Sequence, residues 1–242
     1  MDWLGESTQD RSLTAQARAL LRQNGRVHVP GFLSEAAAQS TFDAMQHADW
    51  RVLCRGQATT YEAPVDGFAA LDGVSQAQLF SSLYADAATG FQYLYDVFRI
   101  SDKVEAGELS EGALAQAYAE FNSSTGLAAL RRLTGDDRIA YVDARATRYR
   151  TGHFLTTHDD DDSAKHRLYA YVLNLTRNWR PDWGGLLMFI SPDGHVAEAF
   201  TPAWNALNIF TVPQPHAVSM VAPYARDNRY SITGWLRAER PA

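Results

Sequence analysis

Residues 139–175 read IAYVDARATRYRTGHFLTTHDDDDSAKHRLYAYVLNL, and short runs of β-branched and aromatic residues alternate in them with turn residues. This texture is typical of short strands joined by tight loops, and it continues to the end of the chain. The helical spacing that marks the first half of the chain is absent from it. The pattern predicts strands near 139–149, 153–158, 167–175, 185–190, 196–200, 206–211, 217–221 and 229–237.

So many short strands in about 100 residues favour a two-sheet sandwich, because hairpins need only short turns whereas parallel crossovers need helices between strands. The predicted fold class is α+β: a double-stranded β-helix core of the jelly-roll or cupin-like kind over 139–242, and a helix-rich covering segment over 1–138. No repeat, low-complexity tract or linker interrupts the chain, so we expect a single domain over 1–242.

The first half of the chain begins with a helix and a strand. Leucine and alanine at helical spacing predict a helix over 12–24 that Gly25 ends, and the alternating run 26–30 predicts a short strand. Ser34 is placed to cap a second helix, which reaches Met45. The first 45 residues are therefore expected to supply two helices and one strand of the covering segment.

Two longer segments repeat the helical spacing. Apolar residues recur at three- and four-residue steps over 75–98 and again over 110–133, which predicts helices there. In this interpretation the aromatic run 91–95 fills the core from a helix. We expect these helices to form a layer over one face of the β core.

Charge and composition narrow the class of partner. The chain has 22 Lys and Arg against 28 Asp and Glu, a formal net charge of −6, and its basic residues are scattered. A nucleic-acid backbone is therefore not the expected partner. Cys54 is the only cysteine, which excludes an intrachain disulfide and a cysteine-rich zinc site. Without a secretory leader or a membrane-spanning apolar stretch, the sequence predicts a cytoplasmic protein that does not contact a membrane.

The chemistry is expected where a predicted strand ends in an acidic loop. His158 and Asp160 are two residues apart, so strand geometry directs both side chains to one face. His216 precedes another predicted strand, and the folded sandwich can bring it to the same place. Two histidines and one carboxylate leave other coordination positions open, as non-haem Fe(II) enzymes require. The sequence predicts a metal site formed by these three residues.

A second signal lies on the last predicted strand, where Arg229, Ser231 and Thr233 share one face. An unpaired guanidinium inside an apolar sandwich is costly, so this arginine requires an anionic ligand. A planar guanidinium matches a carboxylate. We therefore expect Arg229 to hold the far carboxylate of 2-oxoglutarate while the near end of that molecule chelates iron.

Over 149–235 the sequence resembles the 2-oxoglutarate/Fe(II)-dependent dioxygenase superfamily, in particular its prolyl 4-hydroxylase-like group. The segment 25–33 resembles the early strand of that group more loosely. The resemblance rests on Arg148-Tyr149, His158-x-Asp160, Tyr171-Val172-Leu173-Asn174, Trp183-Gly184-Gly185, Pro215-His216 and Arg229-Tyr230-Ser231-Ile232-Thr233, in this order.

The resemblance implies a hydroxylase that couples oxidation of a C–H bond to decarboxylation of 2-oxoglutarate, releasing succinate and CO2. Fe(II) is the implied cofactor, 2-oxoglutarate and O2 are the implied co-substrates, and ascorbate is a reductant that supports turnover in such enzymes. Tyr149 is implied to bond the co-substrate near its metal end, and Ser231 to assist at the other end. A carboxylate at Asp160 argues for hydroxylation, because related halogenases have a small residue there.

One departure from the resemblance concerns the far carboxylate. The hypoxia-factor group has a second tyrosine there, and in this sequence the register gives Val172. The contact is then missing or comes from Ser231 or Thr233, and no role carries over to Tyr171.

Other polar residues have simpler interpretations. His153 is expected on the opposite strand face from His158 and thus in a structural role. The flanking Asp159, Asp161 and Asp162 are expected to form a solvated turn, with a calcium-like cluster or a lip for a basic substrate as the alternatives.

The substrate stays open at this point. A prolyl residue in a protein or peptide is the main hypothesis, a free amino acid or small metabolite is the alternative, and a non-redox cupin-like metal protein is a third. The sequence distinguishes neither a monomer from a homodimer nor one position of hydroxylation from another.

Overall fold

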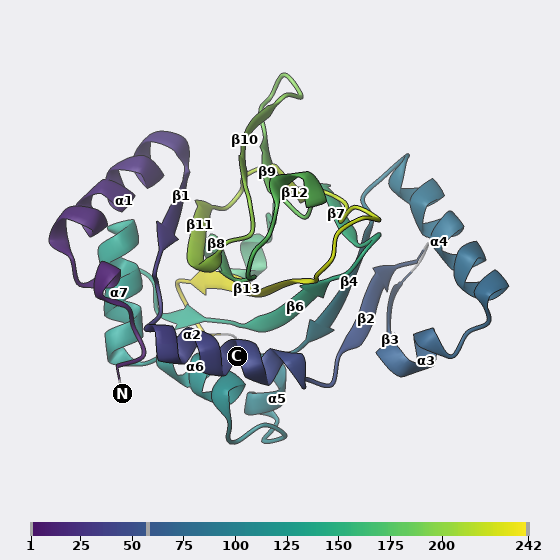
Figure 1. Cartoon of the computed structure of the whole chain (residues 1–242). Coiled ribbons are helices and arrows are strands. Elements are labelled where there is room, and N and C mark those ends of the chain that lie inside the picture. The colour runs from purple at the N-terminus through teal and green to yellow at the C-terminus, as the bar shows by residue number, and fades with distance from the viewer. Residues whose placement is uncertain (1, 57–58, 241–242) are drawn as a thin grey trace.

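The computed structural model describes residues 2–56 and 59–240, and its centre is one antiparallel sheet that curls into a nearly closed barrel (Figure 1). Strands follow the order β1-β11-β8-β13-β6-β4-β7-β12-β9-β10, with β2, β3 and β5 attached at its side. The described strands are β1 (Arg26–Pro30), β2 (Arg51–Arg55), β3 (Thr60–Pro64), β4 (Tyr93–Phe98), β5 (Tyr141–Val142), β6 (Arg145–Tyr149), β7 (Phe154–His158), β8 (Arg167–Leu175), β9 (Leu187–Ile190), β10 (Val196–Phe200), β11 (Trp204–Thr211), β12 (His216–Val218) and β13 (Arg229–Arg237).

Side chains join the two edge strands of the barrel. Arg26 on β1 forms an ion pair with Glu198 on β10, and the ring centroids of His28 and Phe200 lie 5.7 Å apart. These contacts cover an edge that backbone hydrogen bonds leave unpaired. The predicted jelly-roll core with covering helices is confirmed as the fold class.

The predicted strands of the second half all occur, with small shifts at their ends. The run 139–149 divides into β5 and β6 because Asp143 interrupts the ladder: its carboxylate accepts a 2.7 Å hydrogen bond from the backbone N–H of Trp235. The last short strand starts earlier than predicted, at His216. That shift places an imidazole inside the ladder.

Helices cover one side of the barrel and extend from one end of it (Figure 1). They are α1 (Arg11–Asn24), α2 (Glu35–Gln46), α3 (Val65–Ala69), α4 (Gly73–Ala87), α5 (Ile100–Glu105), α6 (Ala113–Phe121) and α7 (Ser124–Thr134), with short 3-10 turns at η1 (Glu6–Thr8), η2 (Ser163–Lys165) and η3 (Pro181–Trp183). Within the described part of the chain, every helix is too short or too polar to cross a bilayer.

The first two predicted helices are confirmed together with their end signals. Gly25 ends α1 with a φ of 70°, a left-handed conformation that glycine adopts without strain. Ser34 caps α2 through a hydrogen bond from the backbone N–H of Ala37 to its hydroxyl oxygen. The end of α1 and the start of α2 are thus each determined by one or two local residues, which is why the sequence predicts both.

The prediction of one helix over 75–98 is wrong in its second part. The helix ends at Ala87, and Tyr93–Phe98 forms strand β4, which pairs with β2, β6 and β7 in the middle of the sheet. Nearly every β4 side chain is buried, so the strand lacks the alternation that marks a half-exposed strand. The aromatic run 91–95 therefore leads into strand β4 and does not pack in the core from a helix.

The helix predicted over 110–133 is two helices, α6 and α7, because the Ser123 hydroxyl accepts the backbone N–H of Gly126 and starts a new helix. Helix α6 packs against the barrel through Phe121, whose ring centroid lies 5.1 Å from that of Tyr171 on β8.

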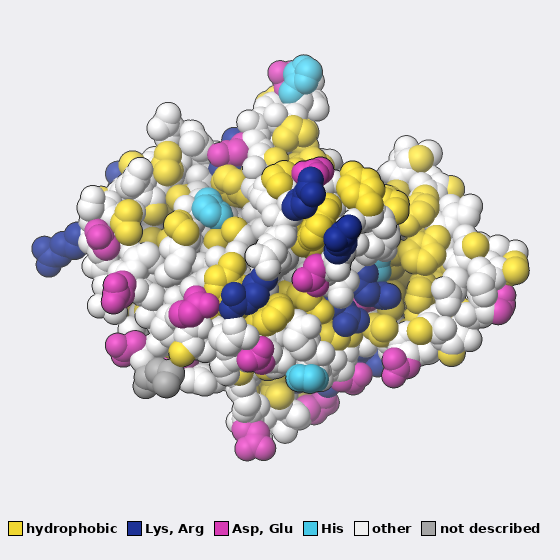
Figure 2. All heavy atoms as spheres, viewed as in Figure 1, with side chains coloured by type: hydrophobic (Ala, Val, Ile, Leu, Met, Phe, Trp, Pro, Cys, Tyr) yellow, Lys and Arg dark blue, Asp and Glu magenta, His cyan; other side chains and the backbone are white. Residues whose placement is uncertain are grey.

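Strands β2 and β3 and helices α3 and α5 were not predicted. With α4, the β2–β3 hairpin and α3 form a lobe at the far end of the barrel, over which hydrophobic side chains gather (Figure 2).

Candidate metal and co-substrate site

Three side chains that could hold a metal ion, His158, Asp160 and His216, meet at one end of the barrel. His158 ends β7 and His216 begins β12, and the two residues are direct partners in the ladder. Asp160 follows β7 with a φ of 63°, a left-handed conformation that aspartate tolerates better than most residues. Its two carboxylate oxygens lie 3.6 Å from His158 Nε2 and 3.6 Å from His216 Nε2. All three ligand atoms lie within 4.8 Å of one another, so one ion can contact them all.

Backbone carbonyls orient both imidazoles. His158 Nδ1 lies 3.0 Å from the carbonyl oxygen of Thr156, and His216 Nδ1 lies 2.8 Å from that of Gln214. A carbonyl accepts only from a protonated nitrogen, so each Nε2 is left with a free lone pair. Burial and the neighbouring His158 lower the pKa of His216 to about 4, which keeps it in the neutral form that binds metal.

This donor set fits Fe(II). Two imidazoles and one carboxylate would hold the ion from the protein side, and the pocket lies on the other side of them. That leaves coordination positions for a chelating oxo-acid and dioxygen. A structural zinc site would instead close its coordination shell with protein ligands.

A pocket of about 530 Å³ extends from this cluster to Arg229. Arg229 is 2% exposed, and its Nε and Nη1 have no hydrogen-bond partner among the described residues. Burial lowers its pKa, and the Tyr149 ring, 5.0 Å from the guanidinium carbon, provides partial compensation. A buried guanidinium with unpaired N–H groups requires an anionic partner, and a carboxylate ligand in the pocket would supply one.

Tyr149 lines the same pocket as the cluster and Arg229. Its ring stacks on Tyr95 with the centroids 5.2 Å apart. Burial raises the pKa of Tyr149 well above its usual value, so the phenol keeps its proton and can donate a hydrogen bond. The side chain belongs to a row on β6 that also brings Arg145 and Thr147 to the pocket.

Some of the other residues predicted from the sequence line the pocket, and others do not. Thr233 lines the pocket, whereas the Ser231 hydroxyl, fully buried, donates to Asn174 Oδ1 at 3.3 Å. Val172 lines the pocket as its register predicts, and the Tyr171 hydroxyl donates to the carbonyl oxygen of Asp143. His153 is buried away from the three-residue cluster.

Several side chains that line the same pocket were not predicted from the sequence. Arg145, Arg167, Tyr95 and Trp235 all line it, and the sequence patterns assign none of them a role. A signal for some of them was present: counting back from Tyr149 by twos reaches Arg145, and counting on from Arg229 by twos reaches Trp235. Tyr95 was not predicted because the apolar spacing around it indicated a helix, whereas it lies on strand β4.

Comparison with known proteins agrees with this site. Residues 144–237 match the family model of the 2OG-Fe(II) oxygenase superfamily. The mouse protein prolyl 3-hydroxylase OGFOD1 is 31% identical over 114 residues, which are 44% of this chain and 20% of the mouse protein. The matched part therefore spans about a fifth of the length of that relative.

Solved structures share the fold at low identity. A 2OG-Fe(II) oxygenase family oxidoreductase from Burkholderia pseudomallei has a TM-score of 0.63 and 16% identity, with 95% of this chain and 92% of that chain covered. A prolyl-4-hydroxylase from Pseudomonas putida has a TM-score of 0.58 and 18% identity, covering 94% and 100%. A Trichoplax adhaerens prolyl hydroxylase in complex with a hypoxia inducible factor peptide fragment has a TM-score of 0.60 and 18% identity, covering 96% and 92%. Residues 144–237, which carry the three-residue cluster and Arg229, are thus similar in sequence to the 2OG-Fe(II) oxygenase superfamily, and the whole chain shares the fold of the solved structures.

Proposed function

We propose that this protein is a 2-oxoglutarate-dependent non-haem iron dioxygenase that hydroxylates a C–H bond. One observation carries the proposal: the His158, Asp160 and His216 cluster and the orphaned guanidinium of Arg229 open onto the same pocket. A chelating dicarboxylate satisfies both ends at once. A non-redox metal protein of the same fold would have no use for the buried arginine.

In this proposal each side chain has a defined task. His158, Asp160 and His216 hold the iron, and Arg229 binds the far carboxylate of 2-oxoglutarate with its planar fork. The phenol of Tyr149 donates a hydrogen bond to the co-substrate, and Thr233, which lines the pocket, offers a hydroxyl to the far carboxylate. Iron, when bound, supplies activation of O2 with 2-oxoglutarate as the reductant, and succinate and CO2 are released. The buried aromatic wall excludes water from that step.

For the substrate we propose a prolyl residue in a protein or peptide. The names of the mouse and Trichoplax relatives support this class, and the latter was solved with a peptide bound. The pocket wall formed by Leu53, Phe91 and Tyr93 is apolar enough to contact a pyrrolidine ring. A free amino acid or small acid is the second candidate, and the cationic side chains described below give a specific reason to test it.

The test is an anaerobic titration of metal-free protein with Fe(II) and then 2-oxoglutarate. A visible metal-to-ligand charge-transfer absorption is expected for the wild type and should be absent from Asp160→Ala. Asp161→Ala is the matched control, because Asp161 is exposed on the same loop and lies outside the cluster. It should retain the band.

Turnover then identifies the substrate class. Succinate release with O2 is measured in the presence of proline-containing peptides and free amino acids, and product mass is checked for addition of one oxygen atom. Absence of the charge-transfer band from correctly folded wild-type protein would refute the proposed function, whereas a band without peptide-dependent succinate release would refute only the prolyl substrate.

A further inference from the structure

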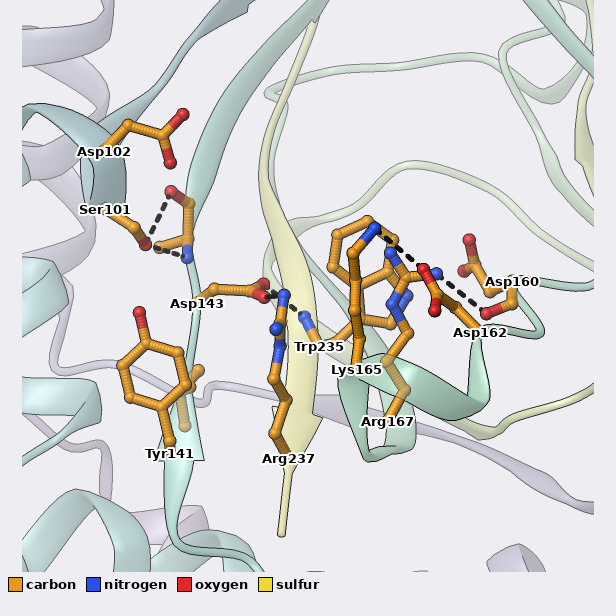
Figure 3. A network of polar contacts seen from close by, with 12 residues as sticks. Ser101, Asp102, Tyr141, Asp143, Asp160, Asp162, Lys165, Arg167, Trp235 and Arg237 are labelled. Carbon is orange, nitrogen blue, oxygen red and sulfur yellow. Dashed lines mark hydrogen bonds and ion pairs between the residues drawn. The ribbon is translucent and has the colours of Figure 1, made fainter. Parts of the chain in front are cut away.

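Two pocket arginines are left unused by iron and 2-oxoglutarate. Arg145 extends from β6 and Arg167 from β8, the strands on either side of β13. Their guanidinium carbons lie 4.6 Å and 3.7 Å from the ring centroid of Trp235 on β13. Figure 3 shows Arg167 beside Trp235. The indole of Trp235 thus makes cation–π contacts with both arginines at the pocket wall.

The other charged side chains that line the pocket already have partners. Arg99 pairs with Glu62 at 2.8 Å, and Lys165 pairs with Asp162 at 2.7 Å. Asp143, beside Arg145, pairs with Arg237 (Figure 3). Among the described lining residues, three arginines therefore face a single unpaired carboxylate: Arg145, Arg167 and Arg229 against Asp160.

Loading the site does not remove this excess. Fe(II) and 2-oxoglutarate carry equal and opposite charges, so their binding leaves the sum unchanged. Asp160 is taken by the iron and Arg229 by the co-substrate. The remaining charge is that of Arg145 and Arg167, next to the position where a substrate must lie.

The donors around these two arginines are also incomplete. Arg167 donates from Nη1 to the carbonyl oxygen of Asp160 at 2.8 Å, but its Nε has no partner among the described residues. Trp235 Nε1 is buried without a partner as well. Burial opposes the charge of Arg145, and the nearby Tyr95, Asp143 and Asp160 outweigh it, so the pKa stays above the usual arginine value. Arg145 is therefore a permanent cation.

We propose that the substrate carries a carboxylate beside the C–H bond to be hydroxylated, and that Arg145 with Arg167 binds it. A neutral substrate that displaced water here would leave two guanidiniums without a counter-charge, which is unfavourable in a closed site. A carboxylate compensates them and accepts their free N–H groups. This inference rests on the proposed function, because it takes Asp160 and Arg229 as occupied by iron and co-substrate.

Two sources can supply that carboxylate. It is either the α-carboxylate of the reacting residue itself, as in a free or C-terminal amino acid, or the side chain of an acidic neighbour in a peptide. Both present the same group to Arg145. The pocket geometry requires only that the carboxylate lie close to the reacting carbon.

Binding to the loaded but inert protein tests the proposal directly. Protein is loaded with Mn(II) and 2-oxoglutarate, and affinities are measured by calorimetry for two matched pairs of probes. The first pair is N-acetyl-L-proline and N-acetyl-L-prolinamide. The second is the blocked tripeptides Asp-Pro-Gly and Asn-Pro-Gly. In at least one pair the acid should bind about tenfold more tightly than its neutral counterpart, as a charge-assisted contact provides, and the pair that shows it identifies the source.

The preference should depend on Arg145. In Arg145→Gln the acid and its neutral counterpart should bind equally, while the neutral affinity changes little. Arg145→Lys should keep part of the preference, because it retains the charge without the fork. Arg99→Gln is the matched control: its charge is already paired, and Glu62 keeps Arg51 as a partner. That variant should retain the full preference.

The alternative is that Arg145 only packs against Trp235. Equal affinities within both wild-type pairs, absence of binding by all four probes, or an equal loss for both members of a pair in Arg145→Gln would overturn the proposal. The anaerobic Fe(II) charge-transfer band is recorded for every variant. Its presence shows an intact site, so failure of the carboxylate preference is distinguished from failure of the proposed function.

Discussion

His158 and His216 face each other across the β7–β12 pair with their ring centroids 4.1 Å apart. Two imidazoles this close, with the Asp160 carboxylate between their Nε2 atoms, form a prepared site for a cation. The arrangement has a measurable consequence for stability.

Metal binding should stabilise the fold. At a free metal concentration of about one hundred times Kd, binding to the native state alone adds about 2.7 kcal/mol, which raises the Tm of a chain of this size by roughly 5 to 10 °C. Mn(II) added to chelator-treated protein should produce this shift, and a chelator should reverse it. His216→Ala should show no metal-dependent shift in differential scanning calorimetry, and a shift as large as that of the wild type would contradict the proposed ligand set.

Arg229→Leu should have opposite effects on function and stability. Removing the guanidinium deletes the carboxylate partner, so the KM for 2-oxoglutarate should rise about a hundredfold, as loss of a buried charge pair costs about 3 kcal/mol or more. The same change removes an unpaired buried charge from the empty pocket, so the free energy of unfolding of the unliganded protein should stay equal or increase by about 1 kcal/mol. Arg226→Leu, on the exposed loop before β13, is the control for both measurements. A drop in unliganded stability for Arg229→Leu would argue that the arginine is structural.

Tyr149→Phe tests the phenol alone. The phenylalanine ring can still stack on Tyr95, so the fold should be retained while one hydrogen-bond donor is lost. One such bond contributes about 0.5 to 1.5 kcal/mol, which corresponds to a two- to tenfold increase in the KM for 2-oxoglutarate. An unchanged KM in steady-state succinate assays would remove Tyr149 from the co-substrate site.

Buried His153 should make the protein sensitive to acid. Burial lowers its pKa to about 4, well below the ordinary value of about 6.5 that applies when unfolded. The unfolded chain therefore binds the proton first, and the stability that neutral His153 contributes is complete above about pH 6.5 and lost as the pH falls toward 4. At pH 5 the loss is about 2 kcal/mol.

His153→Gln isolates this contribution. Free energies of unfolding are measured by urea denaturation at pH 7 and pH 5 in the presence of a chelator. The decrease between the two pH values should be about 2 kcal/mol smaller in the variant than in the wild type. Because His216 is also neutral when buried, it contributes to the decrease in both proteins and cancels in the comparison. Identical decreases would show that His153 does not titrate in this range.

The sequence by itself determined the elements whose signals are local. Gly25 and Ser34 set the end of α1 and the start of α2 through a backbone conformation and a hydrogen bond within a few residues of each end. The short runs after residue 135 indicated strands because they are rich in β-branched and aromatic residues and turn residues separate them. The spacing of His158 and Asp160 predicted that both lie on one face of a strand, but β7 ends at His158, and Asp160 reaches the same cluster from a left-handed conformation beyond the strand.

Only the tertiary structure decided what depends on burial on both faces or on contacts between distant strands. Strand β4 has no alternation because both of its faces are buried, with Leu94 in one cluster with Leu83 of α4 and Tyr95 stacked on Tyr149, so its local pattern resembled that of a helix. The closeness of His216 to His158 follows from the ladder between β12 and β7. The ion pairs that leave Arg145 and Arg167 unmatched join distant parts of the chain, as Arg99 with Glu62 and Asp143 with Arg237 do. The free energy of such charges depends on distance and dielectric, which no separation along the chain specifies.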